Sequence, residues 1–215
     1  MKVEVNGRQI EMEPNSKPYL LKRVIADGFD TVLIFALFML FVALVMKSSL
    51  AATYHSHDER TKAILEETVR TYNNDAKAVT EALNRNNEYQ NERFAAALHG
   101  YLLKAAACLL AELLILLVIP LLNHFRATPG KLMTGIIPFN ERRQSRAVWY
   151  QIVFRFLLIY LFDSLGLYLF TGILTFILVP VLRLMEMLLI RKNRTICDLM
   201  TGITIIEKLS YSGIN

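Results

Sequence analysis

Three long runs of this sequence are almost free of charge, and they constrain the fold more than any other feature. Residues 31–46, 105–122 and 165–182 contain a single charged side chain among them, Glu112. A helix needs about 20 mostly apolar residues to cross the hydrocarbon core of a bilayer. Because 54% of all residues are also hydrophobic, the sequence predicts a membrane protein rather than a soluble domain.

The apolar runs belong to four predicted membrane spans that alternate with segments of different charge. The predicted spans are residues 21–46, 101–122, 147–162 and 165–190, with the polar turn Asp163-Ser164 between the last two. Lys and Arg flank the first span, fill the 123–148 connection and follow the last span. Because such residues stay on the cytoplasmic side, four crossings place both termini in the cytoplasm. We therefore expect an all-α fold, a polytopic four-transmembrane-helix bundle in the cell membrane.

The polar segment 47–100 lies between the first two spans and is expected to form an extracytoplasmic helical insertion. Ser56 and Glu59 match the S-x-x-E pattern that caps a helix start, so a helix is predicted over 56–93. Apolar residues then recur at alternating spacings of four and three, namely Leu65, Val69, Tyr72, Ala76, Val79 and Leu83. This stripe needs a packing partner. The pattern leaves three open: a second helix, the same helix of another subunit, or the membrane-proximal face of the same protein.

The two ends of the chain flank a predicted membrane domain of residues 19–206. Residues 1–18 carry three glutamates and no apolar core, so we expect a cytoplasmic segment and not a signal peptide. Within it, residues 3–12 alternate around Asn6-Gly7, the dipeptide that tight hairpin turns favour, which predicts a small hairpin. Residues 207–215 form a mixed C-terminal tail.

Charged residues inside the predicted spans lie at similar depths. At 1.5 Å per residue, four of them, one from each span, lie roughly 10 to 15 Å from the cytoplasmic ends: Asp30, Glu112, Arg155 and Arg183. Asp27 and Glu186 lie somewhat nearer the cytoplasm. A charge at the bilayer centre costs at least about 2.5 kcal/mol. These side chains should therefore face one another or a water-filled cavity.

One face of the first span carries Arg23, Asp27 and Asp30, which are spaced by four and three and predict a pair between Arg23 and Asp27. Among the charged residues at these depths, acids exceed bases by one even when Arg23 is counted. The acids are Asp27, Asp30, Glu112 and Glu186, and the bases are Arg23, Arg155 and Arg183. An unmatched buried carboxylate is either protonated or binds a cation, so one interpretation is a cation or proton site. The other is that buried charge pairs only fix how the helices pack. The sequence leaves both open.

Three motifs together resemble the RDD family of membrane proteins. They are Arg23-x-x-Ala26-x-x-x-Asp30, Thr128-Pro129-Gly130-Lys131 followed by Gly135, and Arg194-Thr195-x-x-Asp198. By this resemblance, Arg23, Asp30 and Asp198 are the residues that give the family its name. The similarity covers about residues 18 to 206 apart from the 47–100 insertion. Cys197 stands where the family often has His, and Leu132 where a basic residue is common.

The signature from Thr128 to Lys131 also has a physical interpretation. Pro129 fixes φ and Gly130 permits a positive φ, which predicts a tight turn that leaves Lys131 at the cytoplasmic interface, near Asp198 or anionic lipid. The segment is not a phosphate-binding loop, because Gly130-Lys131 lacks the upstream glycine that such a loop requires.

Several classes of function are disfavoured. The basic residues form no dense stripe, so nucleic acid is not an expected partner. Neither a G-x-S-x-G motif nor a metal-ligand spacing occurs, and we expect no enzyme activity, no cofactor and no metal centre. The family resemblance implies monovalent cation/proton exchange, suggested for some members, or an accessory role in membrane complexes, suggested for others.

Two functions are therefore expected as alternatives. The first is transport of Na+, K+ or H+ through a site built from Asp30, Glu112 and Asp198, with Arg23, Arg155 and Arg183 setting the local field. The second is a non-transporting scaffold or accessory subunit that binds a partner through the 56–93 helix. Four spans are few for a carrier, so either function predicts a homo-oligomer or a membrane-protein partner in the lipid bilayer.

Overall fold

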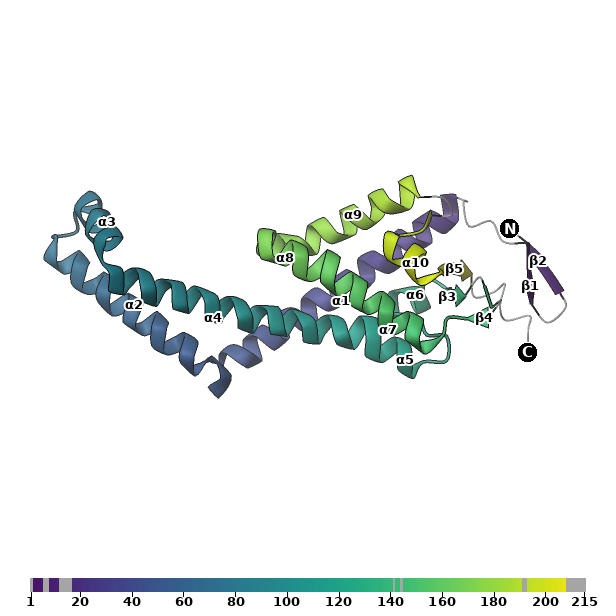
Figure 1. Ribbon diagram of the computed structural model, residues 1–215, viewed down its shortest axis with the longest axis horizontal. Coiled ribbons are helices and arrows are strands. Elements are labelled where there is room, and N and C mark those ends of the chain that lie inside the picture. Colours follow the sequence, from purple (N-terminus) through teal and green to yellow (C-terminus); the bar gives the residue numbers. More distant parts are fainter. Residues whose placement is uncertain are drawn as a thin grey trace. The chain divides into compact units, whose positions relative to one another are not determined.

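A computed structural model describes residues 2–5, 8–11, 17–140, 142–143, 145–190 and 193–207. Its described residues include four helical segments long and apolar enough to cross a membrane, which confirms the predicted number of spans (Figure 1). They are α1 (Lys17–Met46); α4 (Asn87–Glu112) with η2 (Leu113–Val118) and α5 (Ile119–Leu122); α7 (Trp149–Leu158) with η3 (Ile159–Leu165) and α8 (Gly166–Thr171); and η4 (Gly172–Leu174) with α9 (Thr175–Leu189).

These helices carry apolar residues on their outer faces and charged residues on their inner faces. Phe170 and Leu189 are 88% and 84% exposed, whereas Arg23 and Asp30 are fully buried. In water, so much exposed apolar surface would drive aggregation. A bilayer reverses this preference and makes an outward-facing charge costly. The distribution therefore fits helices that are surrounded by lipid.

The third span does not end at Asp163-Ser164, where a turn was predicted. The π-helical segment η3 passes through both residues, and α8 continues the helix to Thr171. The chain turns instead at Gly172, which has a φ of +56°. Only a residue without a Cβ adopts that conformation readily, so backbone freedom and not polarity decides the place of the turn.

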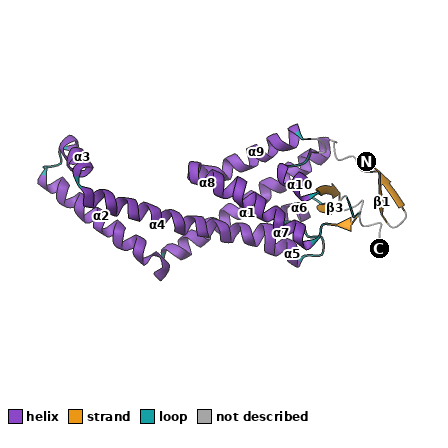
Figure 2. Ribbon diagram, in the orientation of Figure 1, coloured by secondary structure: helices purple, strands orange, loops and turns teal. Residues whose placement is uncertain are grey.

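The chain divides into two compact units, Met1–Leu37 with Leu109–Asn215, and Phe38–Cys108. In the first unit, a three-stranded antiparallel sheet has the order β4-β3-β5 and lies where α7 begins (Figure 2). The strands and the short helices that precede two of them are α6 (Pro129–Met133), β3 (Ile136–Asn140), β4 (Ser145–Arg146), α10 (Ile196–Thr201) and β5 (Ile203–Glu207). The all-α prediction missed this sheet.

An apolar cluster joins the sheet to the membrane helices of the first unit. Its buried members are Tyr19 and Ala26 from α1, Ile136 from β3, Ala147 and Ile152 from the α7 region, and Ile203 and Ile205 from β5. The Tyr19 hydroxyl also donates a hydrogen bond to the Ile205 carbonyl. The sheet is therefore held against the first span by both apolar and polar contacts.

The second unit is helical, but its helices differ from the prediction. They are the last part of α1, η1 (Ser49–Ala51), α2 (Ala52–Thr71), α3 (Ala76–Arg85) and the first part of α4. The predicted start at Ser56 is wrong, because α2 begins four residues earlier. The predicted continuous helix is also wrong: Asn73 and Asn74 adopt positive φ values of 48° and 63°, and Asp75 caps α3. Asn tolerates this conformation better than most residues do.

The predicted apolar stripe is consequently divided between two helices. Val79 and Leu83 on α3 are buried within the unit, whereas Leu65 and Tyr72 remain 37% and 43% exposed. Val69 lies on α2 and Ala76 begins α3, so the six residues do not form one seam. The short turn lets α3 fold back on α2. The α3 half of the stripe is buried, whereas Leu65 and Tyr72 of the other half are exposed.

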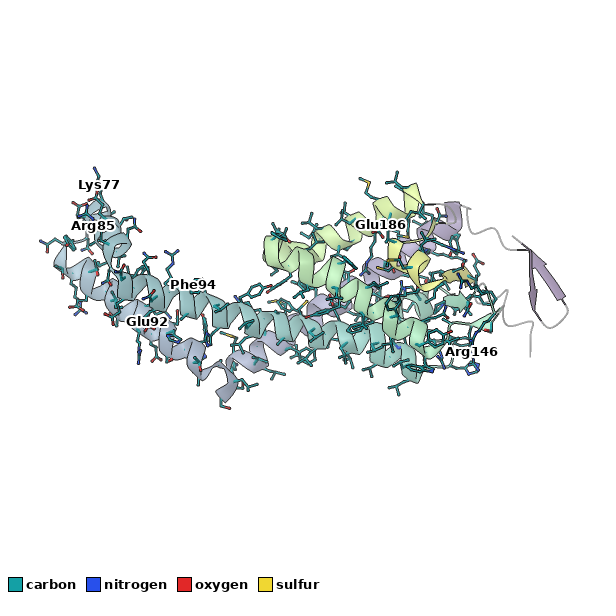
Figure 3. The ribbon with its side chains drawn as sticks, in the orientation of Figure 1. Lys77, Arg85, Glu92, Phe94, Arg146 and Glu186 are labelled. Atoms are coloured by element: carbon teal, nitrogen blue, oxygen red, sulfur yellow. The ribbon has the colours of Figure 1, made fainter. Side chains whose placement is uncertain are left out.

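The helix that begins at Asn87 is too long for a bilayer alone. Its 36 residues up to Leu122 correspond to about 54 Å, against roughly 30 Å of hydrocarbon. Its first turns run beside α2 (Figure 1). There Glu92 faces α2 and accepts from His57, with 2.5 Å between Oε2 and Nδ1 (Figure 3).

The N-terminal residues form the predicted hairpin. β1 (Lys2–Val5) pairs antiparallel with β2 (Arg8–Glu11), with Val5 opposite Arg8. The Asn6-Gly7 turn lies outside the described residues, as do residues 208–215 of the predicted tail.

Candidate functional site

One face of α1 forms the centre of a buried charge network. Arg23, Asp27 and Asp30 are 1%, 5% and 1% exposed, which confirms that the three share an inward face. Their spacing of four and three residues follows the 3.6-residue period of the helix. The hydrogen-bond and ion-pair partners of this face come from α6, from α10 and from Asn193 before α10.

Asp30 accepts hydrogen bonds from the beginning of α6. The Thr128 hydroxyl donates to its Oδ2, and the Gly130 amide donates to its Oδ1 at 2.7 Å. The predicted tight turn is wrong, because Thr128 is the N-cap residue and Pro129 opens a short helix. Pro suits that place because its missing N–H would have no helical partner there.

Gly130 is required by close packing and not by a positive φ. A Cβ at this position would lie 2.1 Å from the Ala26 carbonyl oxygen and 2.9 Å from the Asp30 carboxylate. The backbone of α6 therefore lies directly against the backbone of α1. This approach brings the Gly130 amide within hydrogen-bond distance of Asp30.

Lys131 is buried and faces α1, which corrects its predicted pairing with Asp198 or anionic lipid. Its side chain is 3% exposed, and its Nζ lies 3.1 Å from Asp27 Oδ1 and 3.7 Å from Asp30 Oδ2. The tight contact between α6 and α1 carries this ammonium into the bundle. Neither Asp198 nor lipid is its ion-pair partner.

Asp198 is the second centre of the network. Its Oδ2 accepts from Arg23 Nη2 at 2.5 Å, and its Oδ1 accepts from Arg155 Nε at 2.7 Å. The predicted pair between Arg23 and Asp27 is therefore wrong, since Arg23 binds Asp198 and also donates to the Asn193 carbonyl. Through Asp198, three helices are joined: α1, α7 and α10.

Hydrogen bonds with Thr195 also orient the Asp198 carboxylate. Asp198 N–H donates to Thr195 Oγ1 at 3.2 Å, and the Thr195 N–H donates back to Asp198 Oδ2 at 3.4 Å. This is a reciprocal capping box at the start of α10. Burial opposes ionisation of the carboxyl, but Arg155 and Arg23 outweigh it and hold the pKa of Asp198 well below its usual range.

The other predicted charges occupy different environments. Glu112 and Arg183 are 5% and 8% exposed, on α4 and α9. Arg183 lies close enough to Asp27 to act on it electrostatically. Glu186 is only half-buried, and its Oε2 accepts from the Ile196 amide at 3.1 Å, so it caps α10 (Figure 3).

Several polar contacts beside the network were not predicted. Gln151 on α7 donates to the Thr201 carbonyl at 2.8 Å and accepts from the Asn140 side chain at 3.0 Å. Arg194 donates to the Thr204 hydroxyl on β5. The sequence could have indicated the contacts of Gln151, because a glutamine buried in an apolar helix needs hydrogen-bond partners.

The charges balance within the four ion pairs of the network, although the buried charged residues also include Glu112, Arg183 and Arg194. Its ion pairs join three carboxylates to three cations, namely Asp27, Asp30 and Asp198 with Arg23, Lys131 and Arg155. The predicted acidic excess was counted over a different set of residues, which included Glu112, Glu186 and Arg183 and omitted both Lys131 and Asp198. In the described part of the chain, no group of three or more His, Cys, Asp or Glu side chains is arranged to hold a metal ion.

Comparison with known proteins gives one result. Residues 17–202 match the family model described as RDD family, which confirms the resemblance seen in the sequence motifs. Neither curated proteins nor solved structures provide a match.

The close approach at Gly130 yields a first prediction. We expect Gly130→Ala to lower the stability of the purified protein in detergent by about 3 kcal/mol, because the new methyl group must push α6 away from Ala26. Thermal unfolding measures the effect. Gly28→Ala is the matched control, since nothing lies within 4 Å of its added Cβ. Equal melting temperatures for both variants would contradict the predicted packing.

The pairing of Asp198 yields a second prediction. Asp198→Asn should cost about 3 to 5 kcal/mol, because Arg23 and Arg155 lose their buried counter-charge. The depressed pKa also means that the wild-type contribution is present at neutral pH and declines as pH falls below about 4.

Melting temperatures measured from pH 7 to pH 3 check both parts. The Asn variant should lack this component of the acid-induced decline. Asp58→Asn, which removes a solvent-facing pair with Lys62, should change stability by less than about 1 kcal/mol. An Asp198 variant that behaves like this control would disprove the role of the ion pairs.

Proposed function

The chain belongs to the RDD family, and from this premise we propose that it is a non-transporting scaffold or accessory subunit of a membrane complex. In this proposal it is a multi-pass protein of the cell membrane without catalytic activity. Both termini lie in the cytoplasm, and the helices of the Phe38–Cys108 unit that extend beyond the bilayer bind the partner. The observation that carries the proposal is that Asp27, Asp30 and Asp198 each already face a buried cation of the network.

The partners of Asp30 support a structural role. Its carboxylate accepts from the Thr128 hydroxyl and the Gly130 amide, and it faces Lys131. A cation that bound there would have to displace these donors. Buried ion pairs are weak contributors to net stability but can select one arrangement of helices. A fixed arrangement is what a docking platform requires.

Exposed apolar residues in the second unit support binding of a partner. Phe94 and Leu98, spaced by four on α4, are 69% and 43% exposed. Phe94 projects from the side of α4 opposite Glu92 (Figure 3). Tyr72, at the end of α2, is another exposed aromatic residue. Apolar surface on residues 52–98, an otherwise polar part of this unit, favours contact with another membrane protein or with a second copy of this chain.

Monovalent cation/proton exchange is the second candidate, and one feature favours it. Asp27 and Asp30 share the single ammonium of Lys131, so this part of the network has a local charge of minus one. The compensating positive charge lies at Asp198 with its two arginines. In an exchanger, H+, Na+ or K+ would bind at Asp30 when Lys131 moves away.

Ion flux in proteoliposomes separates the two functions. We expect no Na+- or K+-dependent proton flux from the wild type, and we expect Asp30→Asn to lower the melting temperature because its donors lose a charged acceptor. Glu81→Gln on α3 is the control, because it neutralises an exposed carboxylate outside the network. Flux that disappears in Asp30→Asn, while this variant melts like the wild type, would establish an exchanger.

Cross-linking in native membranes tests the scaffold directly. We expect a photo-reactive residue at position 94 to form a product with a membrane protein or a second copy, because Phe94 is the most exposed aromatic residue of its unit. The same residue at Lys77, an exposed position on α3, is the control and should remain uncoupled (Figure 3). Equal yields at both positions, or none at position 94, would contradict the proposal.

A further inference from the structure

A groove of about 450 Å³ lies between the end of β3, the start of α7 and the end of α10. Its lining includes Arg142 and Arg143 together with Tyr150, Phe154 and Leu199. The groove lies within the first unit and is separate from the buried charge network. It combines two cations with an apolar wall.

The floor of the groove is held by hydrogen bonds. Gln151 bridges all three elements, since it donates to the Thr201 carbonyl and accepts from the Asn140 side chain and the Val148 amide, both at 3.0 Å. Gly202 ends α10 with a φ of +66° beside it. These contacts give the groove a defined shape without a ligand.

The turn that carries the arginines is also held in place. The backbone amides of Arg142 and Arg143 donate to Asn140 Oδ1 at 3.0 and 3.2 Å. Both arginine side chains are exposed, and no acidic residue is among the described residues that line the groove. With Glu141 counted, the Asn140–Arg143 turn still has a net positive charge. Two guanidinium groups favour a ligand with a negative charge, and their forked donors match phosphate oxygens.

The apolar wall indicates what the rest of the ligand is. Phe154 and Leu199 are 46% and 54% exposed, so the wall is open on its outer side. Tyr150 and Phe154 lie one helical turn apart at the beginning of a membrane-spanning helix. The adjacent Trp149 packs edge-on against Tyr150, with ring centroids 6.0 Å apart. Trp and Tyr are typical of the boundary between water and hydrocarbon.

We propose that this groove binds an anionic membrane phospholipid. The headgroup phosphate contacts Arg142 and Arg143, and the first methylene groups of an acyl chain lie along Phe154 and Leu199. A soluble phosphate compound would leave the apolar wall exposed to water, whereas a lipid covers it and remains in the bilayer. Basic pockets at the ends of membrane helices are suited to headgroups for this reason.

The single tryptophan of the chain provides the measurement. Trp149 adjoins Tyr150, so brominated acyl chains in the groove should quench its fluorescence. Purified full-length protein in detergent is titrated with brominated phosphatidylglycerol or with brominated phosphatidylcholine at low mole fraction. We expect half-maximal quenching at a roughly 25-fold lower concentration of the anionic lipid, or about fivefold for each arginine.

Two sets of variants test the groove residues. Arg142→Gln with Arg143→Gln should abolish the preference for the anionic lipid. Arg70→Gln with Arg85→Gln removes two exposed arginines from α2 and α3 and should preserve it. Phe154→Ala keeps the headgroup contacts and should weaken quenching by both lipids.

Three results would overturn the proposal. They are equal quenching by the two lipids, an unchanged preference in the Arg142/Arg143 double variant, and competition by glycerol phosphate at concentrations similar to the lipid. The last result would identify a soluble phosphate compound as the ligand. A fourth result, loss of the preference in both double variants, would also overturn the proposal, because it would indicate general attraction to positive charge and no defined site.

Discussion

The ion pairs of Asp198 with Arg23 and Arg155 are the interaction on which the rest of the first unit depends. They fix α10 against two membrane helices, and α10 leads directly into β5. β5 pairs with β3, which follows α6, and α6 brings Thr128 and Gly130 to Asp30. The Asp198 carboxylate thus connects the C-terminal part of the chain directly to Arg23 at one end of the inward face of α1. Through β5, β3 and α6 it is also connected to Asp30 at the other end.

The features that the sequence predicted correctly are those with a local signature. Uncharged runs indicate spans because a bilayer penalises charge over a fixed length. The spacing of Arg23, Asp27 and Asp30 defines a face because the helical period is fixed. Their partners could not be predicted in this way, because Lys131 and Asp198 lie on helices of five and six residues, too short to show a period. The sequence spacing therefore favoured a local pair between Arg23 and Asp27. In the structure, Arg23 pairs with Asp198 and Asp27 pairs with Lys131.

Other features were missed although the sequence contained a signal. Thr195-x-x-Asp198 is a capping pattern as well as a family motif, and it marks the start of α10. The Asn73-Asn74-Asp75 run is typical of a turn and divides the apolar stripe, although its spacing continues across the break. The requirement for Gly130 had no such signal, because it depends on how closely two backbones approach. If the turn residues had been given more weight than the apolar spacing, the break in the predicted 56–93 helix would have been found. The contacts of Gly130 would still have been missed.

The long sequence separations within the network have a consequence for synthesis. Asp30 lies 98 residues before Thr128, and Arg23 lies 175 residues before Asp198. When α1 emerges from the ribosome, it therefore carries three charges whose partners do not yet exist. Asp27 and Asp30 gain their partner when α6 has been made, and Arg23 gains its partner only with α10. Lipid penalises these charges until then, so the nascent α1 needs a polar or proteinaceous environment.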